Sequence, residues 1–353
     1  MNRINNVTFH LTNSCNLLCK HCWVNAGRSY TNNVDELSIE KWKNIIKQCK
    51  DFGVGIIRYT GGEPLVKKGV DELFSYCYEQ QMPFQIETNG ILLTDSMVQL
   101  ISNCGVRFVT VSLDSATPTF HDSFRNRVGA FDKTICAIDL LSKHAIPFQV
   151  IMCVCKENIE QIPDVIKLCE KYKMNSLKIN PVNDNEFLDK SITLLKINEI
   201  LELNQKIKEW KKSTTLKIVY PLPYAFLSLD ELVHTKPFGC DICNRLAIMP
   251  DGKVSLCGVG ISVPEMIMGD IMTTSLIDIW KHSSIIDVMR DYIPDKLEGV
   301  CSMCIHKKNC MGYCRAFPIM QTHNIYSSYH VCQKAYDENL FPSTRLVDVN
   351  RHE

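Results

Sequence analysis

Three cysteines lie close together in the segment NSCNLLCKHCW, residues 13–23, with the spacing C-x3-C-x2-C. Thiolates bind either zinc or iron–sulfur clusters. A structural zinc site is closed by four ligands, and the nearby His21 is adjacent to the last cysteine and poorly placed to share its metal. Three thiolates leave one iron of a cluster open to a small chelating molecule. The spacing therefore favours a cluster over a zinc knuckle, with the ligands Cys15, Cys19 and Cys22.

Eight further cysteines fall in the last third of the chain. Their spacing runs C-x11-G-x4-C and then C-x2-C-x5-C-x3-C, with one more cysteine beyond. Eight thiols make two complete four-ligand sites, and two structural zinc ions would satisfy that count as well as two iron–sulfur clusters. The eight are Cys240, Cys243, Cys257, Cys301, Cys304, Cys310, Cys314 and Cys332.

The bulk composition excludes several classes of protein. The chain has 353 residues, 45% of them apolar, which favours two globular domains over one. Its 39 basic residues balance 39 acidic ones, so the charge indicates no nucleic acid partner. No segment approaches the roughly 20 apolar residues that span a bilayer, and no export signal is present. We expect a cytoplasmic protein, without a membrane partner, whose 18 cysteines serve metal or redox chemistry rather than disulfides.

Short apolar runs alternate with segments of helical spacing over about the first 210 residues. Six such repeats indicate a parallel α/β sheet with helical crossovers, either an incomplete barrel or an open doubly wound sheet. Strands are predicted at residues 7–12, 55–60, 84–88, 108–112, 148–154 and 176–180. Helices are predicted at residues 39–52, 70–80, 95–104, 131–144, 162–172 and 197–210.

The alternation stops after residue 210, where the proline-marked segment YPLPYAF leads into different material. From residue 239 onward the chain is turn-rich, with one clear helical stretch near residues 276–290, and bound metal would supply stability that its small core lacks. We predict a barrel at residues 1–215, a bridge at 216–235, a cysteine-rich domain at 236–345 and a tail at 346–353.

Functional residues in such sheets gather at the C-terminal ends of the strands. The cysteine loop follows the first predicted strand, and further polar or glycine-rich segments follow the next three. These are Gly61, Gly62, Glu63 and Pro64 after the second strand, Asn89 after the third, and Ser112 and Asp114 at the fourth.

The cysteine spacing, placed after a first strand, resembles the radical S-adenosylmethionine (SAM) superfamily, and the resemblance covers about the first 210 residues. In that family three cysteines bind a 4Fe-4S cluster whose fourth iron is chelated by the amino and carboxylate groups of SAM. One-electron reduction cleaves SAM to methionine and a 5'-deoxyadenosyl radical, which abstracts a substrate hydrogen. The resemblance implies a partial (β/α)6 TIM-like barrel.

The segment TGGEP, residues 60–64, is similar to the family motif that contacts the amino group of SAM. Chemically, Gly61 and Gly62 permit close backbone approach, and Glu63 can accept a hydrogen bond from an ammonium. A plain strand-to-helix turn, with Pro64 at its start, is the alternative.

The later strand ends add polar groups that the family places against SAM. The resemblance assigns such contacts to Asn89, Ser112 and Asp114, and pairs Arg125 with the SAM carboxylate. The alternatives are a turn residue for Asn89, a helix cap for Asp114 and a solvated charge for Arg125. One departure is His21, because the residue before the third cysteine is commonly aromatic in the family.

The later cysteines, together with the phrase IMPDGKVSLC, resemble the SPASM domain, which carries two auxiliary 4Fe-4S clusters. By this resemblance the two ligand sets interleave along the chain. One is Cys240, Cys243, Cys257 and Cys314, and the other is Cys301, Cys304, Cys310 and Cys332. If only one of Cys240 and Cys243 binds, an open iron could take a substrate thiolate; we favour full ligation.

Seven cysteines remain. Cys153 and Cys155 fall near the C-terminal end of the fifth strand, where alternation puts both on one face and a thiol could donate a hydrogen atom to a substrate radical. Core packing is the alternative for these two. The other five fall in helical patterns and are predicted to be buried as small hydrophobes: Cys49, Cys77, Cys104, Cys136 and Cys169.

Three-cluster members of the family commonly modify ribosomally made peptides by crosslinking, thioether formation or epimerisation. We therefore expect a peptide or protein maturase, with tetrapyrrole or other small-molecule tailoring, or sulfatase-type formylglycine maturation, as the alternative; a non-enzymatic metal scaffold is disfavoured. The expected partners are the substrate and an external one-electron donor such as flavodoxin or ferredoxin. Because the first strand starts near residue 5, we also expect a separate leader-recognition protein or direct peptide binding by the barrel and bridge.

Overall fold

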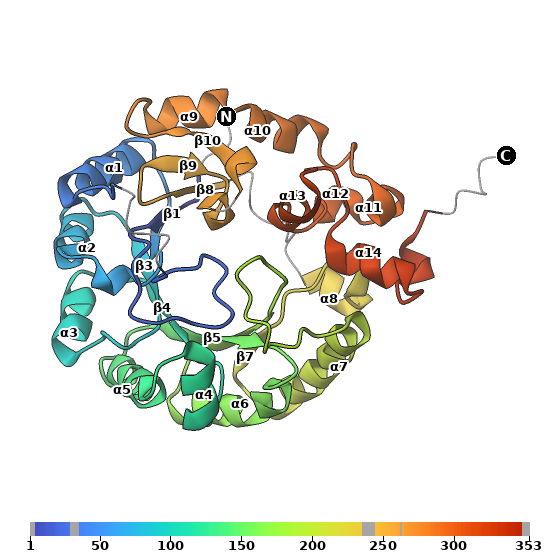
Figure 1. Ribbon diagram of the computed structural model, residues 1–353, viewed down its shortest axis with the longest axis horizontal. Helices are drawn as coiled ribbons and strands as arrows, with labels where there is room; N and C mark the ends of the chain where they lie inside the picture. The colour runs from blue at the N-terminus through green and yellow to red at the C-terminus, as the bar shows by residue number, and fades with distance from the viewer. Residues whose placement is uncertain (1–3, 29–34, 235–243, 262, 348–353) are drawn as a thin grey trace.

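The computed structural model describes residues 4–28, 35–234, 244–261 and 263–347. Over the first 213 residues strands and helices alternate, and the strands curve into a sheet with the helices around its outside (Figure 1). The partial-barrel prediction is confirmed, and each predicted strand is present to within two residues at its ends. The strands are β1 (Asn6–His10), β2 (Ile56–Thr60), β3 (Phe84–Thr88), β4 (Phe108–Ser112), β5 (Phe148–Val154) and β6 (Ser176–Pro181).

The two faces of this sheet differ in polarity because side chains alternate along each strand. On the outer face Phe9 packs against Trp42 of the first helix, with ring centroids 4.8 Å apart, and Tyr59 lies edge-on to Phe9 at 5.7 Å. The inner face carries charge, including an ion pair between Arg58 and Glu87 with N and O 3.3 Å apart. Hydrophobic burial between sheet and helices therefore holds the barrel, which leaves the inner face free for polar groups.

The crossover helices lie where helical spacing predicts them. Two of them begin at a side-chain cap, where Ser38 and Thr94 each accept a hydrogen bond from a first-turn amide. One short helix, α4 (Pro118–Arg125), was not predicted, although Pro118 at its start is a typical helix-initiating residue. The others are α1 (Ile39–Asp51), α2 (Val70–Glu79), α3 (Asp95–Asn103), α5 (Ala130–Lys143), α6 (Ile162–Lys171) and α7 (Ile197–Ser213).

The sheet extends beyond the six predicted strands at both edges. On one side β7 (Lys217–Val219) pairs with β6, and on the other β8 (Arg245–Ile248) pairs in parallel with β1. A hairpin continues from β8 through β9 (Lys253–Ser255) to β10 (Ile267–Asp270), so the sheet has ten strands. Main-chain hydrogen bonds thus join the cysteine-rich segment directly to the barrel.

Short helices make up the rest of the cysteine-rich segment, at the upper right of the barrel in Figure 1. The predicted helical stretch near residues 276–290 is present as three short helices. The expectation that it is the one clear stretch is wrong, because helices of four to eight residues have too few turns to show a period. They are α9 (Leu276–His282), α10 (Ser284–Asp287), the π-helix η8 (Val288–Tyr292), α11 (Gly299–Met303), α12 (Lys307–Cys310), α13 (Ala316–Thr322) and α14 (His330–Asp337), and α8 (Leu229–His234) precedes them in the bridge.

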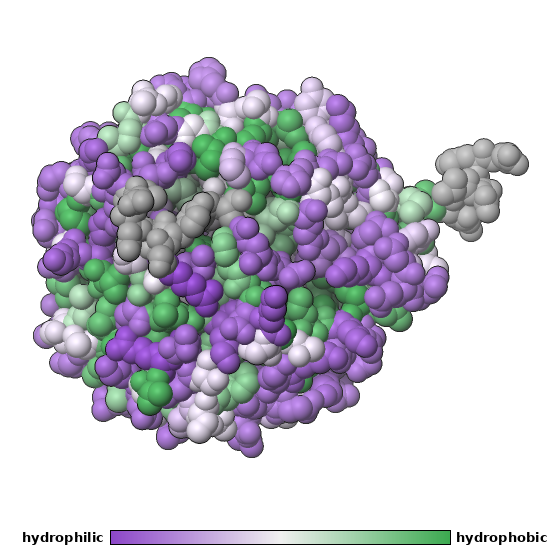
Figure 2. Space-filling view, in the orientation of Figure 1, coloured by the Kyte–Doolittle hydropathy of each residue, from purple (hydrophilic) through white to green (hydrophobic). Residues whose placement is uncertain are grey.

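The surface in this view is mixed in polarity. Figure 2 shows hydrophilic side chains around the edge of the face and hydrophobic ones exposed between them toward its middle. Among the described residues no helix is both long and apolar enough to cross a membrane.

Candidate active site

The three clustered cysteines lie in the loop that follows β1, at the C-terminal end of the parallel strands. Cys19 is buried, and Cys15 and Cys22 are half-buried beside Leu17 and Ala130. Burial raises the pKa of the Cys15 thiol to about 12 and also raises that of Cys19, so metal binding must displace these protons. The three thiols pack around the same small group of side chains. This arrangement fits a site in which three thiolates bind three of the four irons of an iron–sulfur cluster.

Two glycines bring the second strand's loop against the cysteine loop. The amide of Gly62 donates to the carbonyl oxygen of Thr12 at 2.7 Å, and the next amide donates to the carbonyl of Ser14 at 2.9 Å. A Cβ on Gly62 would lie 2.2 Å from the Ser14 oxygen, and Gly61 has a φ of 143°. Only glycine fits this close approach to the cysteine loop, whereas the contact of Gly61 and Gly62 with SAM stays a prediction.

Glu63 is buried and ties neighbouring strand ends together. Its carboxylate accepts hydrogen bonds from the Thr88 hydroxyl at 2.8 Å, the Asn89 amide at 2.8 Å and the Leu65 amide at 3.2 Å. Burial raises the pKa of Glu63 to about 7 in spite of these bonds. A carboxylate has about four acceptor positions, so one position is left for the ammonium that the resemblance assigns to Glu63. Pro64 begins the 3-10 turn η2 (Pro64–Val66).

Asn89 is held in the same network. Its side-chain nitrogen donates to the Asn16 oxygen at 2.7 Å, its side-chain oxygen accepts from the Ile91 amide at 3.0 Å, and it is buried. Ser112, at the end of β4, is half-exposed. Asn89 therefore helps to fix the cysteine loop, in addition to any contact with SAM.

Asp114 and Arg125 form a buried ion pair. The Arg125 Nε donates to the Asp114 Oδ2 at 2.6 Å, and Arg125 Nη1 lies 3.7 Å from the Cys19 sulfur. The second Asp114 oxygen accepts from the Cys153 amide at 2.9 Å. Of the alternatives, the solvated-charge reading of Arg125 is wrong, because its side chain is buried. The guanidinium keeps N–H groups directed toward the cysteine loop, where a SAM carboxylate could accept them.

Two histidines complete the surroundings of the loop. His21 stacks on Phe124 of α4 with centroids 4.3 Å apart, so it fills the position of an aromatic ring in spite of the departure from the family pattern. His10, which sequence reasoning missed, is buried against Trp23, and a Cβ on Gly258 would lie 2.4 Å from its Nε2. Burial lowers the pKa of His10 to about 4. The signal that the sequence offered for His10 was a histidine within the first predicted strand, just ahead of the cysteine loop.

Cys153 and Cys155 have different surroundings. The Cys153 sulfur, an Asp114 oxygen and a His21 nitrogen lie within 4.8 Å of one another, at the edge of the cysteine loop. Strand β5 ends at Val154, so the alternation that placed both thiols on one face does not reach Cys155. Cys155 is fully buried, with its sulfur 3.6 Å from the Asn158 side-chain oxygen. The structure therefore brings only Cys153 to the site.

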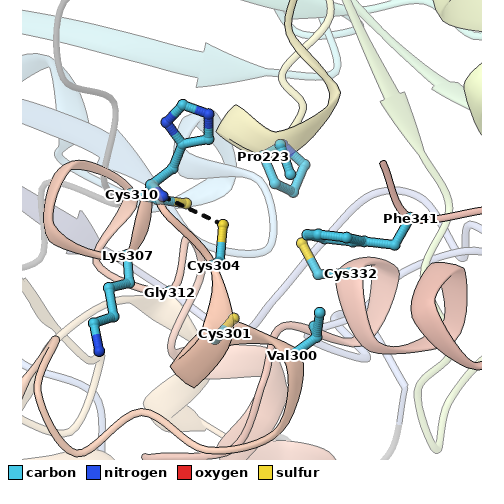
Figure 3. Close-up of a pocket in the computed structure, with 11 residues that line it drawn as sticks. Pro223, Val300, Cys301, Cys304, Lys307, Cys310, Gly312, Cys332 and Phe341 are labelled. Atoms are coloured by element: carbon cyan, nitrogen blue, oxygen red, sulfur yellow. Dashed lines mark hydrogen bonds between the residues drawn. The ribbon is translucent and has the colours of Figure 1, made fainter. Parts of the chain in front are cut away.

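Four of the later cysteines converge on one pocket, which measures about 300 Å³ including the solvent at its mouth. They come from α11, the turn after it, α12 and α14, and Figure 3 shows their sulfur atoms around the same space. Burial raises the pKa of the Cys310 thiol to about 11. Four thiols without a carboxylate in the lining suit the iron–sulfur cluster that the resemblance places there. The four are Cys301, Cys304, Cys310 and Cys332.

The other predicted set is described in part. Cys257 and Cys314 are half-buried, whereas Cys240 and Cys243 lie outside the described residues, so their ligation stays a prediction. Among the remaining cysteines, Cys136 is exposed, which makes its predicted burial wrong. Burial is confirmed for the other four, Cys49, Cys77, Cys104 and Cys169.

A second pocket opens between the barrel and the cysteine-rich segment. It measures about 1030 Å³ including the solvent at its mouth. Its lining combines the loop after β6, the bridge and helix α14, and includes Asn183, Leu222, Tyr329 and His330. This pocket shares Pro223 with the four-cysteine pocket, so the two lie on either side of the bridge.

Comparisons with known proteins agree with this geometry. The profile of the radical SAM superfamily matches residues 9–169, and that of SPASM, an iron–sulfur cluster-binding domain, matches residues 240–305. The AdoMet-dependent heme synthase of Methanosarcina barkeri is 28% identical over 324 residues, which are 88% of this chain and 90% of that protein. The sporulation killing factor maturation protein SkfB of Bacillus subtilis is 34% identical over 162 residues, 46% of this chain and 38% of that one.

A solved structure shares the fold. SuiB of Streptococcus suis, bound to SAM, superimposes with a TM-score of 0.77 at 20% identity, covering 94% of this chain and 78% of SuiB. The cofactors of this protein are accordingly SAM and 4Fe-4S clusters, including the auxiliary clusters of a SPASM domain. The chain therefore belongs to the radical SAM superfamily of enzymes, with a C-terminal SPASM domain.

Proposed function

We propose that this radical SAM enzyme is a maturase that abstracts a hydrogen atom from a peptide or protein substrate. The bound cluster and SAM supply one-electron cleavage and a 5'-deoxyadenosyl radical. The chain's own residues hold the loop: Gly62 brings it close, Asn89 fixes it, and Arg125 directs N–H groups toward it. A buried, fixed arrangement of this kind limits side reactions of a radical.

The observation that carries the peptide proposal is the open pocket between barrel, bridge and α14. It lies beyond the C-terminal end of β6, and its wall mixes apolar groups such as Leu222 with polar groups such as Asn183. An extended peptide offers both main-chain hydrogen bonds and side chains to such a wall. Direct binding by the barrel and bridge would then replace or supplement a separate leader-recognition protein.

Cys153 is proposed as a hydrogen-atom donor to a substrate radical. Its sulfur lies among Asp114 and His21 at the edge of the cysteine loop, and burial raises the pKa of this thiol to about 12, so it keeps its hydrogen at neutral pH. The thiol would give one hydrogen atom to a carbon radical, and the thiyl radical left behind would regain one electron and one proton with an external donor such as ferredoxin or flavodoxin. Such a step belongs to epimerisation.

Tetrapyrrole tailoring is the second candidate. It is favoured by the relative named AdoMet-dependent heme synthase, which matches along most of both chains, whereas SkfB matches along half of this one. The inner face of the barrel also carries Lys178, which forms no ion pair among the described residues. A lysine on this inner face suits a substrate carboxylate, which both a tetrapyrrole and an acidic peptide can provide.

The test uses the anaerobically reconstituted enzyme with SAM and dithionite. Release of 5'-deoxyadenosine establishes radical formation, and none from protein with its full iron would rule it out. The enzyme is then given short peptides encoded by neighbouring genes and, separately, a tetrapyrrole carboxylate. A mass change in a peptide supports the maturase, whereas a change only in the tetrapyrrole replaces it with the second candidate. The matched control is the Cys15→Ala variant, which should modify neither.

A further inference from the structure

Arg315 is a fully buried cation in the cysteine-rich segment, directly after Cys314 and at the start of α13. Its Nη1 donates to the carbonyl oxygens of Ser327 at 2.7 Å and Ile325 at 3.0 Å, and its Nη2 donates to the carbonyl of Gly312. Its Nε has no hydrogen-bond partner in the part of the chain that the structure describes. All three acceptors are neutral carbonyl groups, so they satisfy N–H groups without cancelling the charge.

The backbone around Arg315 is shaped to admit it. Gly312 has a φ of 70°, and a Cβ at that position would lie 2.7 Å from the guanidinium carbon of Arg315. A side chain at residue 312 would therefore displace the guanidinium. The glycine and the three carbonyl acceptors together form a fixed socket for one arginine, which is a costly arrangement unless the charge has a use.

No carboxylate forms an ion pair with Arg315 among the described residues. Gly312, whose carbonyl oxygen accepts from Nη2, lines the four-cysteine pocket, so the guanidinium lies against the wall of that pocket. Cys314, from the other predicted set, directly precedes Arg315. Four thiolates carry more negative charge than the oxidised core of a 4Fe-4S cluster carries positive charge, so each loaded site is a buried anion. A buried cation beside buried anions is stabilised, and stabilises them in return.

We propose that Arg315 is the buried counter-ion of the auxiliary cluster in the four-cysteine pocket, and that its charge raises the reduction potential of that cluster. Adding an electron makes a cluster more negative, and a fixed positive charge nearby favours the reduced form. Arg315 is therefore a positioning residue that prepares this auxiliary cluster to accept an electron. This role holds whatever substrate the enzyme uses, because it concerns the cluster alone.

The test is a redox titration followed by electron paramagnetic resonance. It uses the full chain with Cys15, Cys19 and Cys22 replaced by alanine, so that only auxiliary clusters contribute signals. In this background Arg315→Gln should make at least one auxiliary reduction potential more negative by about 59 mV or more. For one electron this shift is a tenfold change in the equilibrium constant of reduction. Arg315→Lys keeps the charge and should shift the same reduction potential by less than half as much.

Lys307 provides the matched control. It lines the four-cysteine pocket but is half-exposed, with its Nζ bonded to the Ser302 carbonyl at 3.2 Å, so water screens its charge. Lys307→Gln should leave the potentials unchanged. Unshifted potentials in Arg315→Gln at full iron content, or equal shifts in Arg315→Gln and Arg315→Lys, would overturn the proposal.

If Arg315→Gln does not assemble its clusters, the iron content of the variants is measured instead. Arg315→Lys should then still bind about eight irons per chain, four for each cluster, with potentials near those of the parent. Equal loss of iron in both variants would mean that the hydrogen-bond socket matters and the charge does not, which also overturns the proposal. Failure of the peptide proposal would leave these results unaffected, because no substrate is present.

Discussion

The Nε of Arg125 donates to Oδ2 of Asp114 at 2.6 Å, and both side chains are buried beside the cysteine loop. Burial alone would raise the pKa of Asp114, but the Arg125 guanidinium holds it below its ordinary value, so the carboxylate stays charged. Asp114 follows β4, whereas Arg125 is the last residue of α4. The ion pair thus fixes the end of a short helix over the strand ends and leaves Arg125 Nη1 3.7 Å from the Cys19 sulfur.

Replacing Asp114 by asparagine should impair SAM cleavage. The change leaves Arg125 as a buried charge without its anion, which costs about 3–5 kcal/mol of folding stability. Loss of such an orienting partner lowers metal affinity or activity by about 10–100-fold. The measurements are 5'-deoxyadenosine release and the urea midpoint of unfolding. The control, Asp164→Asn, removes an exposed pair with Lys167 and should change stability by less than about 1 kcal/mol; an equally small effect of Asp114→Asn would contradict the prediction.

Replacing Cys15, Cys19 and Cys22 together by alanine should remove one cluster only. With four irons per cluster, the iron content should fall from about twelve to about eight per chain, and SAM cleavage should stop. Iron analysis and 5'-deoxyadenosine release measure the two effects. Cys136→Ala, at an exposed helical position, is the control and should change neither. Cleavage by the triple variant would refute the assignment.

Cys153→Ala and Cys155→Ala should differ in product but not in radical formation. Only Cys153 reaches the site, so Cys153→Ala should keep SAM cleavage yet lose hydrogen return to the substrate. If the product is an epimer, the parent enzyme in heavy water adds one deuterium, detected by mass spectrometry, and crosslinking instead removes two hydrogens. The same loss in Cys155→Ala, whose sulfur is buried against Asn158, would argue against a specific donor.

Gly62→Ala should displace the cysteine loop. The added Cβ would meet the Ser14 carbonyl oxygen at 2.2 Å, and backbone atoms cannot yield cheaply. Overpacking of this kind costs about 1–3 kcal/mol, and we expect a lower midpoint of unfolding and fewer bound irons. Gly129→Ala is the control because a Cβ there meets nothing within 4 Å, although its φ of 77° adds strain. Normal iron content in Gly62→Ala would show that the loop tolerates the shift.

Stability should fall in mild acid because of buried histidines. Burial lowers the pKa of His10 to about 4, below the ordinary value of 6.5, so the unfolded chain binds more protons between these values. The free energy of unfolding therefore decreases as the pH falls through this window, and His10 alone contributes on the order of 1 kcal/mol between pH 7.5 and 5.5. The stability difference between parent and His10→Asn, from urea unfolding at both pH values, should change by that amount. His282→Asn, at an exposed position, should change it little.

Much of the barrel could be predicted because its signals are local. The alternation in β5, with Phe148, Val150 and Met152 buried, identifies a strand whichever residues pair with it. The spacing of Cys15, Cys19 and Cys22 is likewise contained in eight residues, and their position after a strand already implies the active end of the sheet. Helix α4 was missed because two turns give too few apolar repeats.

By itself, the sequence determined the resemblance to the family, the alternation of strands and helices and the cysteine spacing that predicts the cluster ligands, since each depends on residue types at short spacing. Only the tertiary structure decided that Arg125 pairs with Asp114, that Cys153 rather than Cys155 faces the site, and that β8 extends the sheet beside β1. It also decided that Arg315 is buried against the wall of the four-cysteine pocket. These partners are distant in the chain, and their meeting depends on how whole elements pack, which no local pattern records.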